Sequence, residues 1–206
     1  MPLYVKQTAP LMGIWKTEEN SGELLSMLTH TSAYFPFPEK IRTESRKVEW
    51  LAVRVLLKEL LGEEIMIAYH ANGAPYLPGK DLSVSISHTK GYVAVLLCSQ
   101  PFAGIDIEYR GNRILNVRKR FLSPEENDNI DPENEADHLL IYWCAKEALF
   151  KIIGQNDVDF AKHLHVPSFP YKKSGDLVAT ETRTSQAASY ALSFLVNDDF
   201  VLVFMK

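Results

Sequence analysis

The sequence predicts an α+β protein of two similar α/β half-domains, residues 1–101 and 102–206, arranged as a pseudo-twofold dimer. Two observations support this fold class. Each half contains a long segment with apolar residues at helical spacing, and each such segment is followed by two β-branched or apolar runs that a polar turn separates. Because the order of elements is the same in both halves, the chain resembles an internal repeat in organisation, although not in residue identity.

The first half contains one predicted helix and one predicted hairpin. Residues 44–61 (ESRKVEWLAVRVLLKELL) place apolar side chains at helical spacing, and Gly62 is a stop signal. The runs SVSIS and VAVLLC flank the turn-like segment HTKGY. These alternating and β-branched residues predict two antiparallel strands.

The second half repeats this order. Residues 139–153 (LLIYWCAKEALFKII) predict a helix that Gly154 stops, and the runs ASYALSFLV and FVLVFMK, separated by NDD, predict a second hairpin. Between the two halves, Ser123, Pro124 and Glu126 fit an N-cap, a first-turn proline and a capping-box acid. A short helix is therefore expected to begin there.

Composition limits the function classes. Hydrophobic residues make up 46% and charged residues 23% of the 206 residues, as in ordinary globular proteins. The formal net charge of −4 lacks the basic excess of a nucleic-acid binder, so we expect no nucleic-acid partner. Cys98 and Cys144 each lie in an apolar run, which favours buried, reduced thiols over a disulfide framework.

The chain shows no targeting or membrane signal. Its first residues, MPLYVKQTAPLMGIW, lack the basic region, apolar stretch and cleavage site of a signal peptide. The best apolar run, Tyr92 to Cys98, is far shorter than the roughly 20 residues that cross a bilayer. We therefore expect a cytoplasmic monomer that has no membrane partner.

The segment AGIDIEYR carries two acids at a spacing of two. In an extended strand, Asp106 and Glu108 project to the same side, which brings their carboxylates close together. Paired hard oxygen ligands suit Mg²⁺, which completes its shell with water and substrate phosphates. The alternative is a solvated strand edge.

The segment WCAKEALFK places Trp143, Glu147 and Lys151 at successive i, i+4 positions of the predicted helix, so they share one face, while Lys146 projects about a quarter-turn away. The alternative is an ordinary surface ion pair. At the first hairpin turn, Ser87 and His88 bring together a hydroxyl and an imidazole that suit a phosphate, although a turn histidine is more often merely solvated.

Taken together, these motifs resemble a known family. A strand that ends S-I-S-H, then G-I-D-I-E, then W-x-x-K-E-A-x-x-K is similar to the signature of the surfactin-type 4′-phosphopantetheinyl transferases, from about Arg46 to the last hairpin. Members of this family are pseudo-dimers of two similar halves. The resemblance implies Mg²⁺-dependent transfer of the phosphopantetheine arm of coenzyme A to a serine of an acyl or peptidyl carrier protein, with release of adenosine 3′,5′-bisphosphate.

The resemblance also implies roles for residues of the second half. Asp106, Glu108 and Glu147 would bind Mg²⁺, and Glu147 would also be the catalytic base. Lys151 would contact the pyrophosphate and stabilise the leaving group, with help from Lys146.

In the first half, the resemblance implies that Ser87, His88 and Arg46 hold the 3′-phosphate of coenzyme A. Arg42 and Arg54 compete with Arg46 for this role.

The segment R-F-L-S-P-E-E is similar to the R-F-F-S-x-x-E segment of the family, on the side where the carrier protein docks. Arg120 and Phe121 would then give an acidic carrier helix basic and apolar contacts. The alternative for Phe121 is a place in the core.

One position departs from the family pattern. Gly73, Ala74 and Pro75 stand where many members have G-K-P, so a lysine that contacts phosphate is missing. Lys80 is a candidate to replace it, because a lysine acts as a flexible point charge. The departure keeps open a non-catalytic module of the same fold that binds carrier protein or coenzyme A. A magnesium-dependent hydrolase of nucleotide diphosphates is a third alternative.

Overall fold

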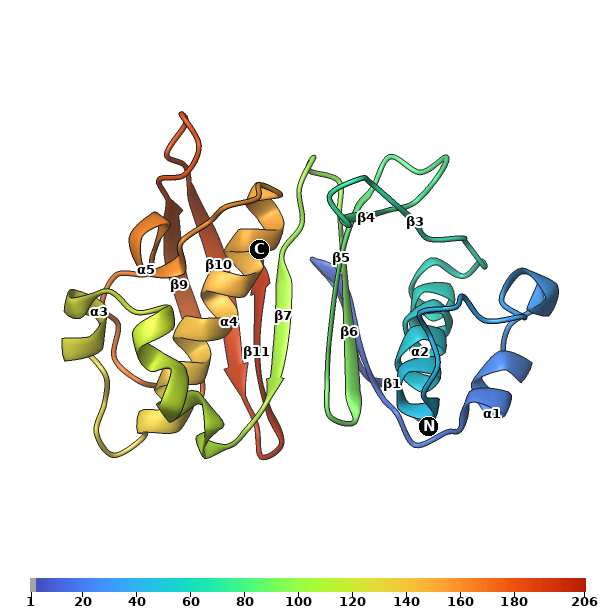
Figure 1. Cartoon of the computed structure of the whole chain (residues 1–206), viewed down its shortest axis with the longest axis horizontal. Coiled ribbons are helices and arrows are strands. Elements are labelled where there is room, and N and C mark those ends of the chain that lie inside the picture. The colour runs from blue at the N-terminus through green and yellow to red at the C-terminus, as the bar shows by residue number, and fades with distance from the viewer. Residues whose placement is uncertain (1–2) are drawn as a thin grey trace. The chain divides into compact units, whose positions relative to one another are not determined.

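The computed structural model describes residues 3–206, and the chain divides between Pro101 and Phe102 into two compact units. We call them unit 1 and unit 2 in chain order. Each unit combines one antiparallel sheet with one long helix that packs on it (Figure 1). The predicted α+β class is confirmed, and the pseudo-twofold arrangement stays a prediction.

Unit 1 contains a six-stranded sheet in the order β1-β2-β6-β5-β4-β3. Its strands are β1 (Leu3–Thr8), β2 (Leu11–Lys16), β3 (Ala68–Tyr69), β4 (Pro75–Tyr76), β5 (Ser83–Thr89) and β6 (Tyr92–Cys98). Its helices are α1 (Ser21–Ser26), the 3₁₀ helix η1 (Thr31–Ala33) and α2 (Glu44–Leu61).

The bounds of α2 agree with the predicted helix because its end signals are local. The Thr43 side chain accepts a hydrogen bond from the Arg46 backbone N–H, which caps the first turn. Gly62 ends the helix with a φ of 74°, a left-handed conformation that glycine adopts without strain. Between these ends, α2 packs on β2 and β6, with Leu51 and Leu56 fully buried. This apolar contact forms the core of unit 1.

Unit 2 contains a five-stranded sheet in the order β7-β11-β10-β9-β8. Its strands are β7 (Ile105–Tyr109), β8 (Leu164–His165), β9 (Ser174–Glu181), β10 (Ser189–Val196) and β11 (Phe200–Met205). Its helices are the 3₁₀ helix η2 (Asn112–Arg120), α3 (Pro124–Asp128), α4 (Glu135–Ile153) and α5 (Phe160–His163).

The helix α4 begins at Glu135, earlier than the predicted Leu139, because acidic side chains in its first turn suit the helix N-terminus although they carry no apolar signal. It ends at Gly154, whose φ is 61°. Ser123 and Glu126 form the predicted capping box of α3. The long helix α4 packs on β7 and β11, which places its residues against the acidic strand.

The two units share a strand order that the sequence pattern did not include. In unit 1 the strand β2 precedes α2 and pairs with β6, the last strand of the hairpin. In unit 2 the strand β7 precedes α4 and pairs with β11, again the last strand. The repeated helix and hairpin are therefore confirmed as parts of a longer repeated plan. Within residues 3–206, every helix is too short or too polar to cross a bilayer.

Candidate functional site

The first candidate site lies where α4 packs on β7 in unit 2. The Lys151 ammonium donates to Asp106 Oδ1 and to the Ile105 carbonyl, both at 2.8 Å. On the same face of α4, Trp143 Nε1 donates a hydrogen bond to Glu108 Oε1 at 3.2 Å. Asp106 and Glu108 therefore share the face of β7 that α4 covers. With only 5% of Asp106 exposed, the alternative of a solvated strand edge does not describe this carboxylate.

Glu147 lies on α4 between Trp143 and Lys151, in the electrostatic field of the acidic strand. The pKa of Glu147 is raised from its ordinary value of 4.5 to about 7, mainly by burial and next by the charge of Asp106, while Lys151 opposes the increase. Glu108 adds a smaller increase to this pKa. The alternative of a surface Glu–Lys pair is not what the structure shows, since Lys151 forms its ion pair with Asp106.

This donor set suits a hard divalent cation. Three carboxylates near one ammonium leave an excess of negative charge, and carboxylate oxygens are ligands that Mg²⁺ prefers. Among residues 3–206, no three His, Cys, Asp or Glu side chains are already arranged to hold a metal ion. The Asp106 carboxylate instead bonds to Lys151. The residues fit Mg²⁺ in their chemistry, and a coordination shell is not formed in advance.

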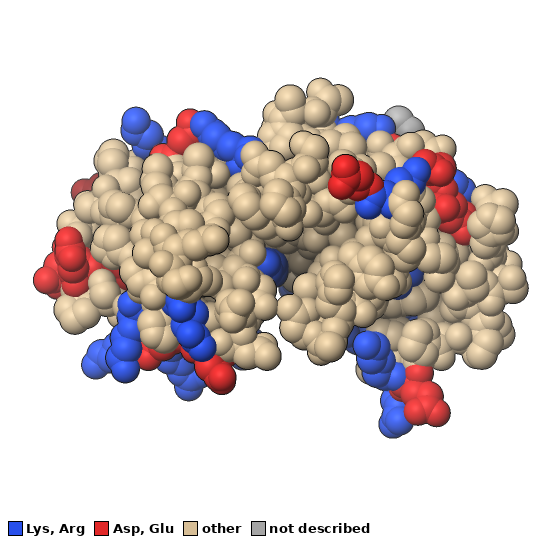
Figure 2. Space-filling model, turned by 90° about the horizontal axis from the view of Figure 1, so that it is seen from above, with Lys and Arg blue, Asp and Glu red and all other residues tan. Residues whose placement is uncertain are grey.

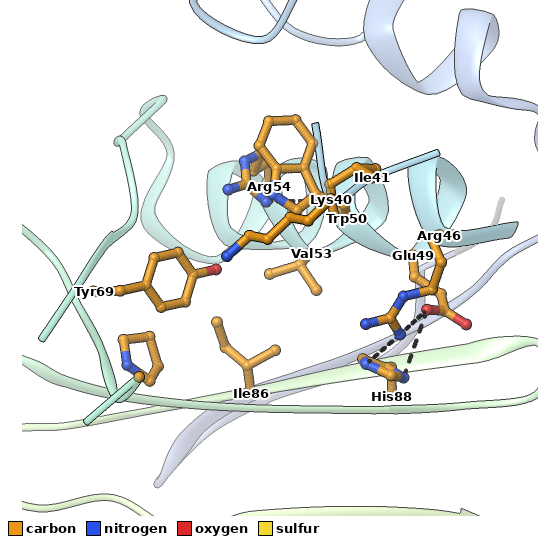
Figure 3. Close-up of a pocket in the computed structure, with 12 residues that line it drawn as sticks. Lys40, Ile41, Arg46, Glu49, Trp50, Val53, Arg54, Tyr69, Ile86 and His88 are labelled. Atoms are coloured by element: carbon orange, nitrogen blue, oxygen red, sulfur yellow. Dashed lines mark hydrogen bonds and ion pairs between the residues drawn. The ribbon is translucent and has the colours of Figure 1, made fainter. Parts of the chain in front are cut away.

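The second candidate site is a pocket of about 420 Å³ in unit 1, between α2, β5 and the loops that flank them (Figure 3). Its apolar and aromatic walls are Ile41, Trp50, Val53, Tyr69, Pro75 and Ile86. Its charged or titratable lining residues are Lys40, Arg46, Glu49, Arg54 and His88. The pocket thus combines flat rings with an excess of cations.

Arg46 and His88, which were both expected to hold the 3′-phosphate of coenzyme A, meet at one end of this pocket. Arg46 Nη1 lies 3.2 Å from His88 Nε2 and donates to Glu49 Oε2 at 2.8 Å. Glu49 Oε2 also lies 3.7 Å from His88 Nδ1. Figure 3 shows this triangle of side chains, which fixes both nitrogen-bearing groups at the pocket wall.

Arg54 also lines the pocket and is almost completely buried, with 4% exposed. Its guanidinium lies 3.3 Å from the centroid of the Trp50 ring, and Nη1 donates to the Trp50 carbonyl at 2.7 Å. Burial lowers the pKa of Arg54 to about 10. Within the described part of the chain, its Nε has no hydrogen-bond partner. Arg46 and Arg54 therefore both remain candidates for an anion, whereas Arg42 is not part of the pocket lining.

Two expected contacts in unit 2 are corrected by burial. Lys146 is 0% exposed, and its ammonium donates to Glu126 Oε2 and to the carbonyls of Phe121 and Phe160, so it does not face a ligand site. Phe121 is also 0% exposed and packs edge-on against Trp143, so it belongs to the core and not to a docking surface. In contrast, Arg120 is exposed.

Two expectations in unit 1 also change. Ser87 and His88 are adjacent on β5, so their side chains point to opposite faces, and Ser87 does not line the pocket with His88. Lys80 forms an ion pair with Glu63 at 2.6 Å and also lies outside the lining. Within unit 1, neither the Ser87 hydroxyl nor Lys80 therefore lines this pocket.

The lining residues that sequence reasoning missed include Lys40, Trp50 and Tyr69. Lys40 is exposed, and its amine lies 5.8 Å from the centroid of the Tyr69 ring. The pocket that Lys40 lines is also lined by Gly73 and Pro75, the neighbours of Ala74. Lys40 was missed because a lysine in a loop belongs to no periodic pattern. Trp50 was missed because the sequence identified it only as one residue of the predicted helix.

Charged side chains on the surface are mixed in sign. Figure 2 shows Lys and Arg in small groups beside Asp and Glu on the face seen from above.

Comparison with known proteins gives a consistent result for the second half of the chain. Residues 103–202, which include Asp106, Glu108, Glu147 and Lys151, match the model of the 4′-phosphopantetheinyl transferase superfamily. A 4′-phosphopantetheinyl transferase of Bacillus subtilis is 32% identical over 87 residues, which are 40% of this chain and 38% of the relative.

A second relative is the 4′-phosphopantetheinyl transferase AcpT of Escherichia coli strain K12. It is 29% identical over 129 residues, which are 58% of this chain and 66% of the relative. The chain therefore spans less than two thirds of the length of each of these relatives. Through residues 103–202, the second half of the chain is similar to the 4′-phosphopantetheinyl transferase superfamily.

Proposed function

We propose that this protein is a Mg²⁺-dependent 4′-phosphopantetheinyl transferase. It moves the phosphopantetheine arm of coenzyme A to a serine of an acyl or peptidyl carrier protein and releases adenosine 3′,5′-bisphosphate. The observation that carries this proposal is the approach of Glu147 and Lys151 on α4 to the two acids of β7. The names of the two relatives support the same activity.

In unit 2, the proposed chemistry divides among four side chains. Transfer of a substituted phosphate requires mainly positioning and neutralisation of negative charge. Asp106, Glu108 and Glu147 would hold Mg²⁺, which supplies Lewis-acid stabilisation of phosphate oxygens when bound. Lys151 would place a positive charge next to the pyrophosphate.

Glu147 would act as the base for the carrier serine. As the serine oxygen forms its bond to phosphorus, the bond from phosphorus to the bridging oxygen of the pyrophosphate breaks, and the serine proton passes to Glu147. In the absence of metal, burial and the charge of Asp106 raise the pKa of Glu147 to about 7, and a general base works best when its pKa lies near the working pH.

In unit 1, the pocket is proposed to hold the nucleotide end of coenzyme A. A volume of about 420 Å³ is typical of small-molecule sites, and the Trp50 and Tyr69 rings suit a flat base. Arg46, Arg54 and Lys40 suit a phosphate. We propose that Lys40, and not Lys80, supplies the positive charge of the lysine that many family members have at the position of Ala74.

The carrier protein is proposed to dock against the basic end of η2. Lys119 and Arg120 are exposed there, whereas Arg118 is engaged by Glu135 and Asn127. Exposed basic residues would attract an acidic carrier helix and speed its encounter. The proposal includes that the protein is a cytoplasmic monomer. Its partners are coenzyme A and a carrier protein, and it binds neither nucleic acid nor membrane.

The test is to incubate the full chain with coenzyme A, Mg²⁺ and apo carrier proteins of fatty-acid, polyketide and peptide synthesis. Intact mass spectrometry follows each carrier, and chromatography follows the nucleotide product. Modified carrier with an equal amount of adenosine 3′,5′-bisphosphate is the expected result. Nucleotide release without carrier modification would favour a hydrolase, and tight binding of coenzyme A without either product would favour a non-catalytic module.

A further inference from the structure

Trp143 shares one face of α4 in unit 2 with Glu147 and Lys151, and the proposed chemistry gives it no role. Its indole N–H donates to Glu108 Oε1 at 3.2 Å, and it lies one helical turn from Glu147. A carboxylate on a strand can rotate about its side-chain bonds. A hydrogen bond to one oxygen limits that rotation, as contacts behind metal ligands commonly do.

The indole is itself held in place by two aromatic rings. The Phe160 ring stacks on Trp143 with centroids 5.6 Å apart and an angle of 28° between the planes. The Phe121 ring meets it edge-on, with a centroid distance of 5.2 Å and an angle of 72°. Both contacts hold the indole in the orientation that points its N–H toward Glu108.

Lys146 fixes the backbone of both of these aromatic residues. Its ammonium donates to the Phe121 carbonyl at 2.6 Å and to the Phe160 carbonyl at 3.0 Å. Its charge is balanced by Glu126, which is 1% exposed and lies 2.6 Å away. A buried, hydrogen-bonded ion pair of this kind favours one specific arrangement of the segments that it joins.

From these contacts we propose that Trp143 is a positioning residue that orients Glu108 for a divalent cation, supported by Phe121, Phe160 and the buried Lys146. The inference rests on the proposed function, because it requires that Glu108 is a metal ligand. It assigns Lys146 a part in this support in place of the expected contact with coenzyme A.

The test compares Trp143→Phe with the matched control Trp15→Phe in the full chain. Both substitutions keep an aromatic ring and remove an indole N–H that donates to a glutamate, since Trp15 Nε1 donates to Glu19 Oε2 at 3.3 Å in unit 1. Mn²⁺ is titrated into each protein in the presence of coenzyme A, and free Mn²⁺ is measured by electron paramagnetic resonance. Thermal unfolding of each protein is measured in parallel.

We expect Trp143→Phe to weaken Mn²⁺ binding about 10- to 100-fold, the usual effect of losing a contact behind a metal ligand. Trp15→Phe should leave Mn²⁺ binding unchanged. A second variant, Phe160→Leu, should weaken binding in the same direction but less, because it loosens the indole without removing its N–H.

Equal Mn²⁺ affinity in Trp143→Phe and the parent protein would overturn the inference and leave the proposed function intact. Weaker binding in Trp143→Phe that is matched by Trp15→Phe would also overturn it, since the effect would then not depend on Glu108. If the parent protein binds no Mn²⁺ with coenzyme A, the proposed function itself fails, and the inference fails with it.

Discussion

The two candidate sites differ in charge, in shape and in the kind of element that supplies them. The site in unit 2 is acidic, and its side chains come from one strand and one helix that pack together. The pocket in unit 1 is rich in cations and rings, and its lining comes from a helix, strands and loops. An acidic cluster suits metal-assisted chemistry, whereas a cationic aromatic pocket suits an anionic nucleotide.

This difference indicates a division of labour. Substitutions in unit 2 should mainly lower the rate of the chemical step, and substitutions in unit 1 should mainly weaken the binding of coenzyme A. Kinetics can separate the two effects, because loss of an interaction made only in the transition state lowers kcat, whereas loss of uniform binding raises KM.

The largest effect is expected for Asp106→Asn. The amide keeps the shape of this buried side chain but removes a negatively charged group, which is the proposed metal ligand and the ion partner of Lys151. Loss of metal assistance costs several kcal/mol, so we expect transfer to fall about 10⁴-fold or more in a carrier-modification assay. The exposed Asp198→Asn is the matched control and should transfer at the parent rate. Full turnover by Asp106→Asn, or by the parent protein in excess chelator, would contradict a metal role for this carboxylate.

Glu147→Gln should lower kcat roughly 10²- to 10⁴-fold, the usual contribution of a positioned base. The KM for coenzyme A should change little, because the proposed base would act on the carrier serine and not on coenzyme A. Steady-state kinetics with each substrate varied in turn gives both values. A loss confined to coenzyme A affinity would make Glu147 a binding residue and remove the contrast between the two sites.

The raised pKa of Glu147 also predicts that the stability of the protein depends on pH, and Glu147→Gln tests this. The pKa of Glu147 rises from 4.5 to about 7 on folding, so the folded state binds a proton more tightly than the unfolded state. The parent protein should therefore lose stability as the pH rises from about 4.5 to about 7. Without metal, Glu147→Gln should be more stable than the parent at pH 8, with the difference disappearing near pH 4. Thermal unfolding in chelator at both pH values checks the sign.

In unit 1, Lys40→Ala should raise the KM for coenzyme A about tenfold and leave kcat nearly unchanged. A charge-assisted hydrogen bond to phosphate contributes about 1.5 to 3 kcal/mol, and an exposed lysine should lie at the low end. Lys80→Ala is the matched control, because Lys80 pairs with Glu63 and does not line the pocket. If Lys80→Ala raised the KM for coenzyme A as much as Lys40→Ala did, the proposal that Lys40 replaces the missing lysine at position 74 would be wrong.

The smallest effect is expected at the proposed docking surface. Arg120→Ala should raise the KM for the carrier protein severalfold, with a stronger effect at low salt, since an exposed charge acts mainly on encounter. Phe121→Ala should instead destabilise the fold by about 3 to 5 kcal/mol, because it empties a fully buried site. If Phe121→Ala raised only the carrier KM and left thermal stability unchanged, the core assignment would be wrong.

Elements with local signals were predictable from the sequence. Helix α2 has a threonine cap, a buried apolar face and a terminal glycine, and α3 has a complete capping box. The strands β2 and β9 were missed because Gly13 in β2 and Gly175 and Asp176 in β9 are residue types that strands disfavour. A Cβ at Gly13 in β2 would lie 2.7 Å from Leu56 Cδ1, so a larger residue there would require the Leu56 side chain to shift. Such strands are set by tertiary contacts more than by propensity.

The same distinction holds for the sites. The strand spacing of two residues predicted that Asp106 and Glu108 share a face, and the helix spacing of four residues predicted the same for Glu147 and Lys151. Both predictions were possible because these periodicities are local. The burial of Lys146 could not be predicted, because its ion partner Glu126 and its carbonyl partners lie on other segments. The pocket of unit 1 was only partly predicted for the same reason.

The division of labour is tested most directly by calorimetric titration of coenzyme A, in chelator, into the parent protein, Asp106→Asn and Lys40→Ala. The account predicts that Asp106→Asn binds coenzyme A at least as tightly as the parent although it cannot transfer the arm. Lys40→Ala should bind about tenfold more weakly and still transfer the arm when Mg²⁺ and saturating coenzyme A are supplied. Loss of coenzyme A binding in Asp106→Asn, together with unchanged binding in Lys40→Ala, would contradict the account.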